Sequence, residues 1–328
     1  MTEPPEINLA RRLAEKYCLK PPIDIDELAK RYARVVVTFL PAGLDVDGAT
    51  FDLKRSRKRP TIVVNENRPR SRRRFTTAHE LGHVLIPWHI GPILDELVLT
   101  DGKLGTPYWE LESEANRFAS EILMPTPWIT EVVKTLESPS ASLEQIVNAA
   151  DVSAFAAVIA LNNNLPEGYV YARLNDEGYV ASSGRSEGTL ANVPAQGSHI
   201  DQNAIYPVSD EKWHSKQADG LYVWWHLPSE AALPRAVDQR GWREILEEML
   251  EDIRVPKEEI GKFKQSVNGV FGSANGRATA RTAESIYSAA MQRFHSHAQH
   301  TITFRRLVDH KKFASYLRSR IEDVLNKL

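Results

Sequence analysis

The sequence predicts an α+β fold, and three features support this prediction. Short runs rich in β-branched residues fall between residues 35 and 65, and helical periodicity then continues to about residue 164. From 166 to about 227, aromatic and β-branched runs alternate with Gly, Asn and Ser clusters, and helical periodicity returns after residue 231. Strands and helices that are grouped along the chain, instead of alternating regularly, are typical of α+β domains.

The composition narrows the class of protein. With 42% hydrophobic and 26% charged residues, the 328-residue chain resembles an ordinary soluble globular protein. A formal net charge of −2 excludes a polyelectrolyte role for the chain as a whole. The one cysteine, Cys18, excludes an internal disulfide, fits a reducing cytoplasm and is expected to be a buried apolar residue. Neither a signal-peptide pattern nor an apolar run of about 18 residues is found, so we expect a cytoplasmic protein without a membrane span.

The first elements follow from capping and periodicity. Residues 7–17 predict an amphipathic helix, and residues 23–33 predict another, with Asp24 or Asp26 near its N-cap. Three strands are expected after these helices. They cover 35–40, 49–54 and 61–65, and the basic turn KRSRKRP makes the last two a hairpin.

The remaining elements are mostly helices. A helix is expected over 72–86, where Pro87 ends it, and a loop over 90–107. A further helix covers 108–123, and short helices extend to 164. The changes of pattern give three segments, of which the last two are also compatible with a single domain: 1–165, 166–230 and 231–328.

The stretch RRRFTTAHELGHVLIPWHI contains the pattern H-E-x-x-H. His79 and His83 are four residues apart, so on a helix they share one face and can reach one ion. Two imidazoles and a carboxylate, with water in the fourth position, form a known catalytic zinc arrangement. Glu80 is rotated about 100° from His79, which suits a general base better than a ligand. The stretch therefore predicts a catalytic metal site.

Such a site needs a third ligand, and WELESEANRFASEILMP offers several carboxylates. We favour Glu112, because Asn116 then lies one turn further on and can hydrogen-bond a ligand. Glu110, near the helix start, and Glu114, which is expected to face elsewhere, are the alternatives. These acids are also compatible with a solvated first helical turn, where the helix dipole favours negative charge.

His89 is another candidate ligand. It lies ten residues after His79, the spacing of the H-E-x-x-H-x-x-G-x-x-H class. That class has glycine where this chain has Ile86, and Ile followed by Pro87 suits the required turn poorly. We therefore expect His89 to be a surface histidine on a loop.

The segments RFTTAHELGH and ELESEANRFASEILMP together resemble the ImmA/IrrE family of zinc metallopeptidases. The resemblance covers roughly residues 7–165. It implies a zincin-like catalytic domain with a small antiparallel sheet, Zn²⁺ held by His79, His83 and Glu112, and Glu80 as the catalytic base. Family members typically cleave helix-turn-helix transcriptional repressors and so switch on stress, phage-defence or mobile-element genes. Many carry a sensor-like C-terminal region, which here would be the mixed α/β part after residue 165.

Substrate contacts are less well defined by the sequence. An extended peptide is expected to add as a strand to an exposed sheet edge, with residues 49–53 as one candidate, although such an edge is also an ordinary sheet margin. Tyr108 and His89 are weak candidates for stabilising the oxyanion.

Basic residues gather in two places. Ten lie between Lys54 and Arg74, where they could attract an acidic substrate segment or nucleic acid, or form a solvated surface. Residues 255–328 contain 13 Lys/Arg against 6 Asp/Glu, which suits either a nucleic-acid site or a basic amphipathic helix packed on the rest of the protein. The segment HSHAQH also lies here, but its histidines do not share one helical face and no acidic or Cys partner is near, so we do not expect a second metal site. The alternative function is a nucleic-acid-binding regulator in which the H-E-x-x-H metal site is structural and catalyses no hydrolysis. Residues 142–164 contain no basic residue and are expected to belong to the catalytic core.

Overall fold

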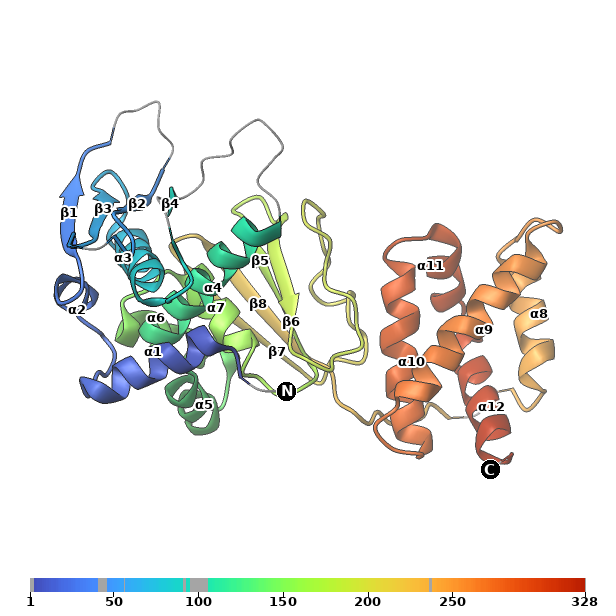
Figure 1. The fold of residues 1–328 in the computed structure, drawn as a ribbon. Coiled ribbons are helices and arrows are strands. Elements are labelled where there is room, and N and C mark those ends of the chain that lie inside the picture. Colours follow the sequence, from blue (N-terminus) through green and yellow to red (C-terminus); the bar gives the residue numbers. More distant parts are fainter. Residues whose placement is uncertain are drawn as a thin grey trace. The chain divides into compact units, whose positions relative to one another are not determined.

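The computed structural model describes residues 3–40, 46–55, 57–90, 93–94, 106–235 and 238–327, and of residues 93, 94 and 106–108 the backbone only. The chain forms two compact units, Met1–Asn164 and Leu165–Leu328. Figure 1 labels the helices and strands of both. Strands and helices occur in both units, so the α+β class holds. Among the described residues, no helix has the length and apolar character needed to cross a membrane.

The first unit contains most of the elements that the sequence predicts. Asp24 caps α2 by accepting a hydrogen bond from the backbone N–H of Glu27. Cys18 follows α1 with a φ of 51° and is exposed, so the expectation of a buried thiol is wrong. The elements are α1 (Pro5–Lys16), α2 (Ile25–Lys30), β1 (Arg34–Thr38), β2 (Gly48–Phe51), β3 (Thr61–Asn65), α3 (Arg70–Leu85), β4 (Ile93–Leu94), α4 (Thr106–Leu123), α5 (Thr126–Thr135), α6 (Pro139–Ala150) and α7 (Ala154–Asn162).

The sheet of the first unit has the order β1-β3-β2-β4. The predicted hairpin is confirmed, because β2 runs antiparallel to β3 with Ala49 opposite Val63. Two expectations are wrong. The sheet is mixed, since β1 is parallel to β3, and residues 49–53 are not an edge, since β2 also pairs with β4. Sequence patterns identify strands but do not show which strands pair or in which direction. In addition, β4 has only two residues and lies within a stretch expected to be a loop, so the sequence did not show that it covers β2.

Close packing of α3 against α4 sets the frame for the site. A Cβ atom on Gly82 would lie 3.1 Å from Phe118 Cδ1 and 3.4 Å from the Cα atom of Ala115, so glycine lets the two helices approach closely here. Phe118 and Ala115 are fully buried. The side chains that α3 and α4 present to each other are therefore held at short, well-defined separations.

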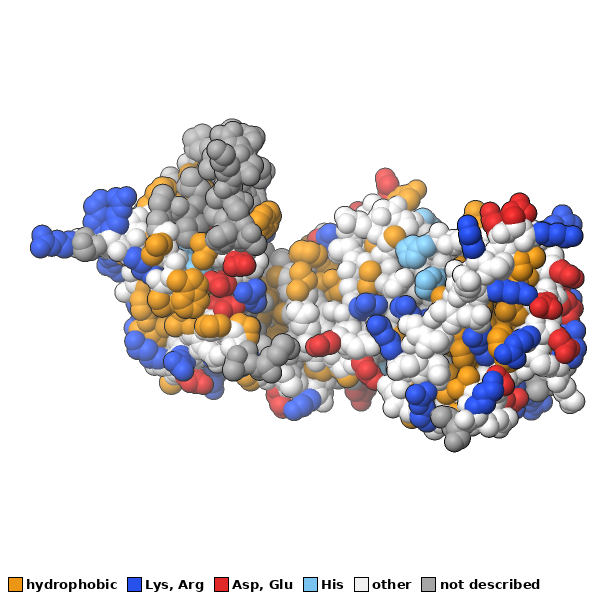
Figure 2. All heavy atoms as spheres, turned by 45° about the vertical axis from the view of Figure 1, so that its right-hand side comes forward, with side chains coloured by type: hydrophobic (Ala, Val, Ile, Leu, Met, Phe, Trp, Pro, Cys, Tyr) orange, Lys and Arg blue, Asp and Glu red, His pale blue; other side chains and the backbone are white. Residues whose placement is uncertain are grey.

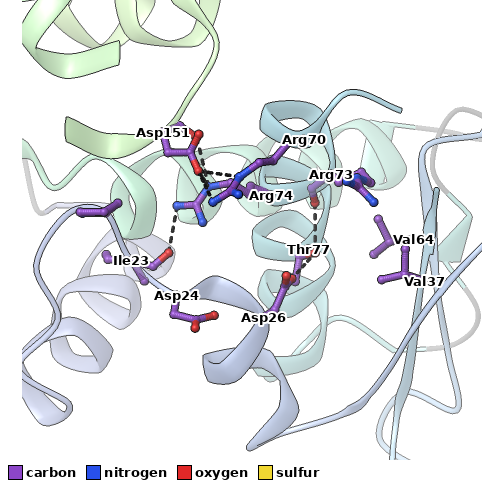
Figure 3. Close-up of a pocket in the computed structure, with 11 residues that line it drawn as sticks. Ile23, Asp24, Asp26, Val37, Val64, Arg70, Arg73, Arg74, Thr77 and Asp151 are labelled. Atoms are coloured by element: carbon purple, nitrogen blue, oxygen red, sulfur yellow. Dashed lines mark hydrogen bonds and ion pairs between the residues drawn. The ribbon is translucent and has the colours of Figure 1, made fainter. Parts of the chain in front are cut away.

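The arginines at the start of α3 fix this helix to the rest of the unit. Arg70 and Arg74 both point to the Asp151 carboxylate, at 2.8 and 3.4 Å, and Arg74 also donates to the main-chain oxygen of Ile23 at 2.9 Å (Figure 3). Arg68 and Arg72 form ion pairs with the buried Asp47. Four arginines of the basic run thus form ion pairs within this unit, while the side chains of Arg70 and Arg72 stay 74% and 50% exposed.

A cavity of about 510 Å³ lies between this part of α3, α2 and the sheet. Figure 3 shows the residues that line it. Thr77 lines it, and its hydroxyl bonds to Asp26 at 3.2 Å. Two residues along a helix turn the side-chain direction by about 200°. The cavity therefore lies on the side of α3 opposite to His79.

The second unit combines a sheet with a helical bundle. All strand pairs in its sheet are antiparallel, in the order β6-β5-β8-β7, and Val170, Val223 and Trp225 belong to its core. The helices enclose a separate core that includes Phe294 and Leu317. The elements are β5 (Tyr169–Leu174), β6 (Val180–Arg185), β7 (Glu211–Gln217), β8 (Gly220–His226), α8 (Trp242–Asp252), α9 (Ile260–Arg277), α10 (Ala283–Ala298), α11 (Ile302–Val308) and α12 (Phe313–Leu325).

Candidate metal centre

Helices α3 and α4 bring two imidazoles and one carboxylate together. His79 Nε2 and His83 Nε2 are 3.0 Å apart. Glu112 places Oε2 3.1 Å from His79 Nε2 and Oε1 3.5 Å from His83 Nε2. All three ligand atoms lie within 4.8 Å of one another. His79 and His83 are buried, and the Glu112 side chain is 12% exposed.

The hydrogen bonds around the two imidazoles define which nitrogens face the centre without a proton. His79 Nδ1 lies 2.9 Å from Asn116 Oδ1, an acceptor, so this nitrogen carries the proton and Nε2 keeps its lone pair. The hydrogen bond from a candidate ligand to Asn116 that the helical spacing predicts is therefore present, with His79 as the donor. For His83, Nδ1 lies 2.7 Å from His89 Nδ1, again on the side away from the centre.

These three residues suit a tetrahedral metal ion. Zinc–nitrogen bonds of about 2.0–2.1 Å imply ligand separations of about 3.3–3.4 Å in a tetrahedron, and the measured separations of 3.0, 3.1 and 3.5 Å bracket that range. Lone pairs and a carboxylate that face one another at such distances repel unless a cation lies among them. Glu112 Oε1 is also buried and accepts no hydrogen bond.

The protonation states agree with ligand roles. Burial lowers the pKa of His83 to about 4, despite the nearby carboxylate of Glu112. Burial by itself would raise the pKa of Glu112, but the close interactions with the His79 and His83 imidazoles more than offset this and lower it to about 2. At neutral pH the site therefore presents a neutral imidazole and an ionised carboxylate, the forms that bind metal ions.

Glu80 lies outside this group, between α3 and β2. Its buried carboxylate accepts a hydrogen bond from the hydroxyl of Thr50 on β2. A Cβ atom on Gly48 would lie 3.1 Å from Glu80 Oε1 and 2.4 Å from Thr76 Cγ2, so glycine at this position leaves the room that both side chains occupy. The roles of Thr50 and Gly48 have no signal in the sequence, because strand residues near a site look like any others.

His89 differs most from its expectation. It is fully buried, not on the surface, and burial lowers its pKa. Its Nε2 lies 2.8 Å from Glu114 Oε2, and the indole of Trp88 donates to the same oxygen at 2.6 Å. Glu114 thus faces His89, away from the group of His79, His83 and Glu112, as the spacing from Glu112 predicts. His89 touches His83 from behind, so it is not placed as a third ligand.

The other candidates lie away from this group. Glu110 is exposed at the start of α4, and the side chain of Tyr108 is outside the described residues. Among the residues that the structure describes, His79, His83 and Glu112 are the set of His, Cys, Asp and Glu side chains that converges as a metal site would require. The segment HSHAQH on α10 and after it forms no such set.

Two histidines on one helix with a carboxylate from the next define the class of an H-E-x-x-H metallopeptidase centre. Comparison with known proteins agrees with this class and identifies a family within it that resembles part of the chain. Residues 31–162 match the family described as IrrE N-terminal-like domain (Peptidase_M78). The matches support an ImmA/IrrE-type metallopeptidase domain in this part of the chain.

Two curated relatives have the same name, radiation response metalloprotease IrrE. The protein from Deinococcus radiodurans is 32% identical over 166 residues, which cover 49% of this chain and 47% of the relative. The protein from Deinococcus deserti is 30% identical over 186 residues, which cover 54% and 62%. The chain thus spans about half to three fifths of these relatives. A Mycobacterium tuberculosis transcriptional regulator of known structure superposes with a TM-score of 0.40 at 13% identity, over 67% of this chain and 74% of that one.

Proposed function

We propose that the protein is a zinc-dependent endopeptidase that cleaves a helix-turn-helix transcriptional repressor and thereby relieves repression of stress-response or phage-defence genes. The observation that carries the proposal is the convergence of two imidazole lone pairs and an ionised carboxylate, His79, His83 and Glu112. The name of the two relatives, radiation response metalloprotease, supports a role in a stress response. The family resemblance supplies the repressor as the substrate class.

The surrounding residues suit peptide hydrolysis. A bound zinc ion supplies Lewis acidity, which polarises a carbonyl and lowers the pKa of water. Glu80 takes the proton of the attacking water as the new carbon–oxygen bond forms, and passes it to the nitrogen as the carbon–nitrogen bond breaks. Thr50 holds the Glu80 carboxylate in place by its hydrogen bond. Three protein ligands leave a coordination position open, whereas structural zinc normally has four protein ligands.

The alternative, a nucleic-acid-binding regulator without hydrolysis, depends on the basic C-terminal segment. Several of its cations form ion pairs, as Lys264 does with Glu247 at 2.8 Å and Arg318 with Glu322 at 2.8 Å. On the visible face of the helices α8–α12, basic and acidic side chains are interspersed (Figure 2). This distribution favours the peptidase over the alternative, because nucleic-acid sites gather positive charge on one surface.

The decisive experiment compares the wild type with Glu80→Gln, using as substrate the helix-turn-helix repressor encoded beside the gene. We expect the wild type to cleave this repressor, a chelator to stop cleavage, and Glu80→Gln to bind zinc as tightly as the wild type without cleaving. Glu110→Gln, which neutralises an exposed carboxylate near the start of the same α4, is the matched control and should cleave normally. Cleavage by Glu80→Gln at the wild-type rate would exclude the mechanism. An intact repressor together with specific binding of operator DNA would favour the alternative.

A further inference from the structure

We propose that His89 and Glu114 form a positioning pair that holds the His83 imidazole in the tautomer whose Nε2 faces the metal centre. The inference rests on the proposed metal centre and extends it, since it assigns a role to two residues that hold no ligand position. It depends on hydrogen-bond chemistry along a chain of four side chains: Glu112, His83, His89 and Glu114.

The backbone after α3 brings His89 behind His83. The helix ends at Leu85, and Ile86 is extended with φ −66° and ψ 119°. The backbone N–H of His89 then donates to the main-chain oxygen of Ile86 at 3.3 Å, which closes a turn. The His83 and His89 rings lie with their centroids 4.8 Å apart, and His89 is fully buried. A buried imidazole must find partners for both nitrogens, and His89 has one on each side.

The direction of the hydrogen bonds between these four side chains follows from the last of them, Glu114. The ionised Glu114 carboxylate can only accept, so His89 Nε2, 2.8 Å away, carries a proton. Neutral His89 then has its lone pair on Nδ1, which can only accept from His83 Nδ1 at 2.7 Å. The proton of His83 is therefore on Nδ1, and its Nε2 offers a lone pair to the centre. Trp88 steadies the carboxylate by donating to it at 2.6 Å.

Residues of α4 fix the tautomers of both His79 and His83, the first directly and the second through His89. Asn116 on α4 accepts directly from His79 Nδ1 at 2.9 Å. For His83, the partner is His89, and Glu114 on the same α4 accepts from the far side of His89. Such partners of metal-ligating histidines fix the tautomer and the ring orientation. The packing of α3 on α4 thereby sets the ligand Glu112 and the tautomers of both histidines together.

Three variants test the proposal without any peptide substrate. His89→Phe keeps an aromatic ring and removes the acceptor for His83. Glu114→Leu removes the carboxylate from a side chain that is 21% exposed, which limits the effect on folding. Glu114→Gln keeps an amide oxygen that can still accept from His89, so it is the conservative rescue. His199→Phe, at an exposed histidine of the second unit, is the matched control.

The first measurement is the nitrogen-15 NMR signal of the His83 ring in metal-free protein with labelled histidine. We expect a protonated Nδ1 in the wild type, in Glu114→Gln and in the control. In His89→Phe the proton should move to Nε2, where Glu112 accepts it, and Glu114→Leu should give a mixture. The second measurement is zinc affinity by chelator competition, which should weaken by roughly 10–100-fold in His89→Phe and less in Glu114→Leu.

A His83 ring that stays protonated on Nδ1 in both His89→Phe and Glu114→Leu, with zinc affinity within twofold of the wild type, would overturn the proposal. If His89→Phe does not fold, the result for Glu114→Leu decides. Because neither measurement needs cleavage, a protein that shows the expected tautomers and affinities but cleaves no repressor would count against the proposed function only.

Discussion

Gly48→Ala provides a sharp test of how the sheet supports the site. The added methyl group would lie 2.4 Å from Thr76 Cγ2, 3.0 Å from the main-chain oxygen of Val63 and 3.1 Å from Glu80 Oε1. The first distance is far below van der Waals contact, and Thr76 is buried, so its side chain or the strand must move. Overpacking of this kind costs about 1–3 kcal/mol. At about 3 °C per kcal/mol for a unit of this size, the melting temperature should fall by roughly 3–9 °C.

The second variant in this test isolates the clash. Thr76→Ser removes the methyl group that the new Cβ meets, so Gly48→Ala with Thr76→Ser should recover most of the lost stability. Calorimetry that resolves the transition of the first unit measures both effects. Zinc affinity should change little, because the proposed ligands come from α3 and α4, whereas repressor cleavage should fall because Glu80 is displaced. Gly269→Ala, where a Cβ would meet nothing within 4 Å, is the control and should not destabilise. An unchanged melting temperature in Gly48→Ala, or no recovery in the double variant, would refute the reasoning.

Three further predictions concern the ligands, the ion pairs and pH. Glu112→Gln removes a proposed ligand, so zinc affinity by chelator competition should fall by more than the roughly 10–100-fold typical of outer hydrogen-bond partners; unchanged affinity would exclude Glu112 as a ligand. Asp151→Asn keeps a residue that tolerates the φ of 53° but removes the charge that pairs with Arg70 and Arg74. Denaturant unfolding should therefore show a free energy of unfolding that is lower by about 1–3 kcal/mol. An unchanged free energy of unfolding would contradict the anchoring role of Asp151. Burial lowers the pKa of His295 from 6.5 to about 4, so the folded state disfavours its protonation. The contribution of the neutral imidazole to the free energy of unfolding is therefore complete above about pH 6.5. It should be lost, by roughly 3 kcal/mol, as the pH drops to about 4. In His295→Gln the free energy of unfolding should depend less on pH over this range. The same pH dependence in the variant and the wild type would show that His295 is not the group responsible.

The local structure near the site was open to prediction from the sequence. The four-residue spacing of His79 and His83 places them on one helical face, and Pro87 ends that helix, because both effects act within one or two turns. The same reasoning, applied to α4, favoured Glu112 over Glu114 and placed Asn116 beside a proposed ligand. Periodicity also located the strands, since alternation and β-branched content are properties of a few consecutive residues.

Only the tertiary structure decided which distant segments meet. The order of strands put β2 inside the sheet, because the two-residue β4 covers its edge and no periodicity marks so short a strand. Asp47 and Asp151, which are far from each other in sequence, form ion pairs with arginines at the start of α3, and the sequence did not identify these partners. His89 became buried against His83 because a turn after a proline folds back onto the helix. Contacts of this kind depend on packing between elements, which nearest-neighbour patterns along the chain do not encode.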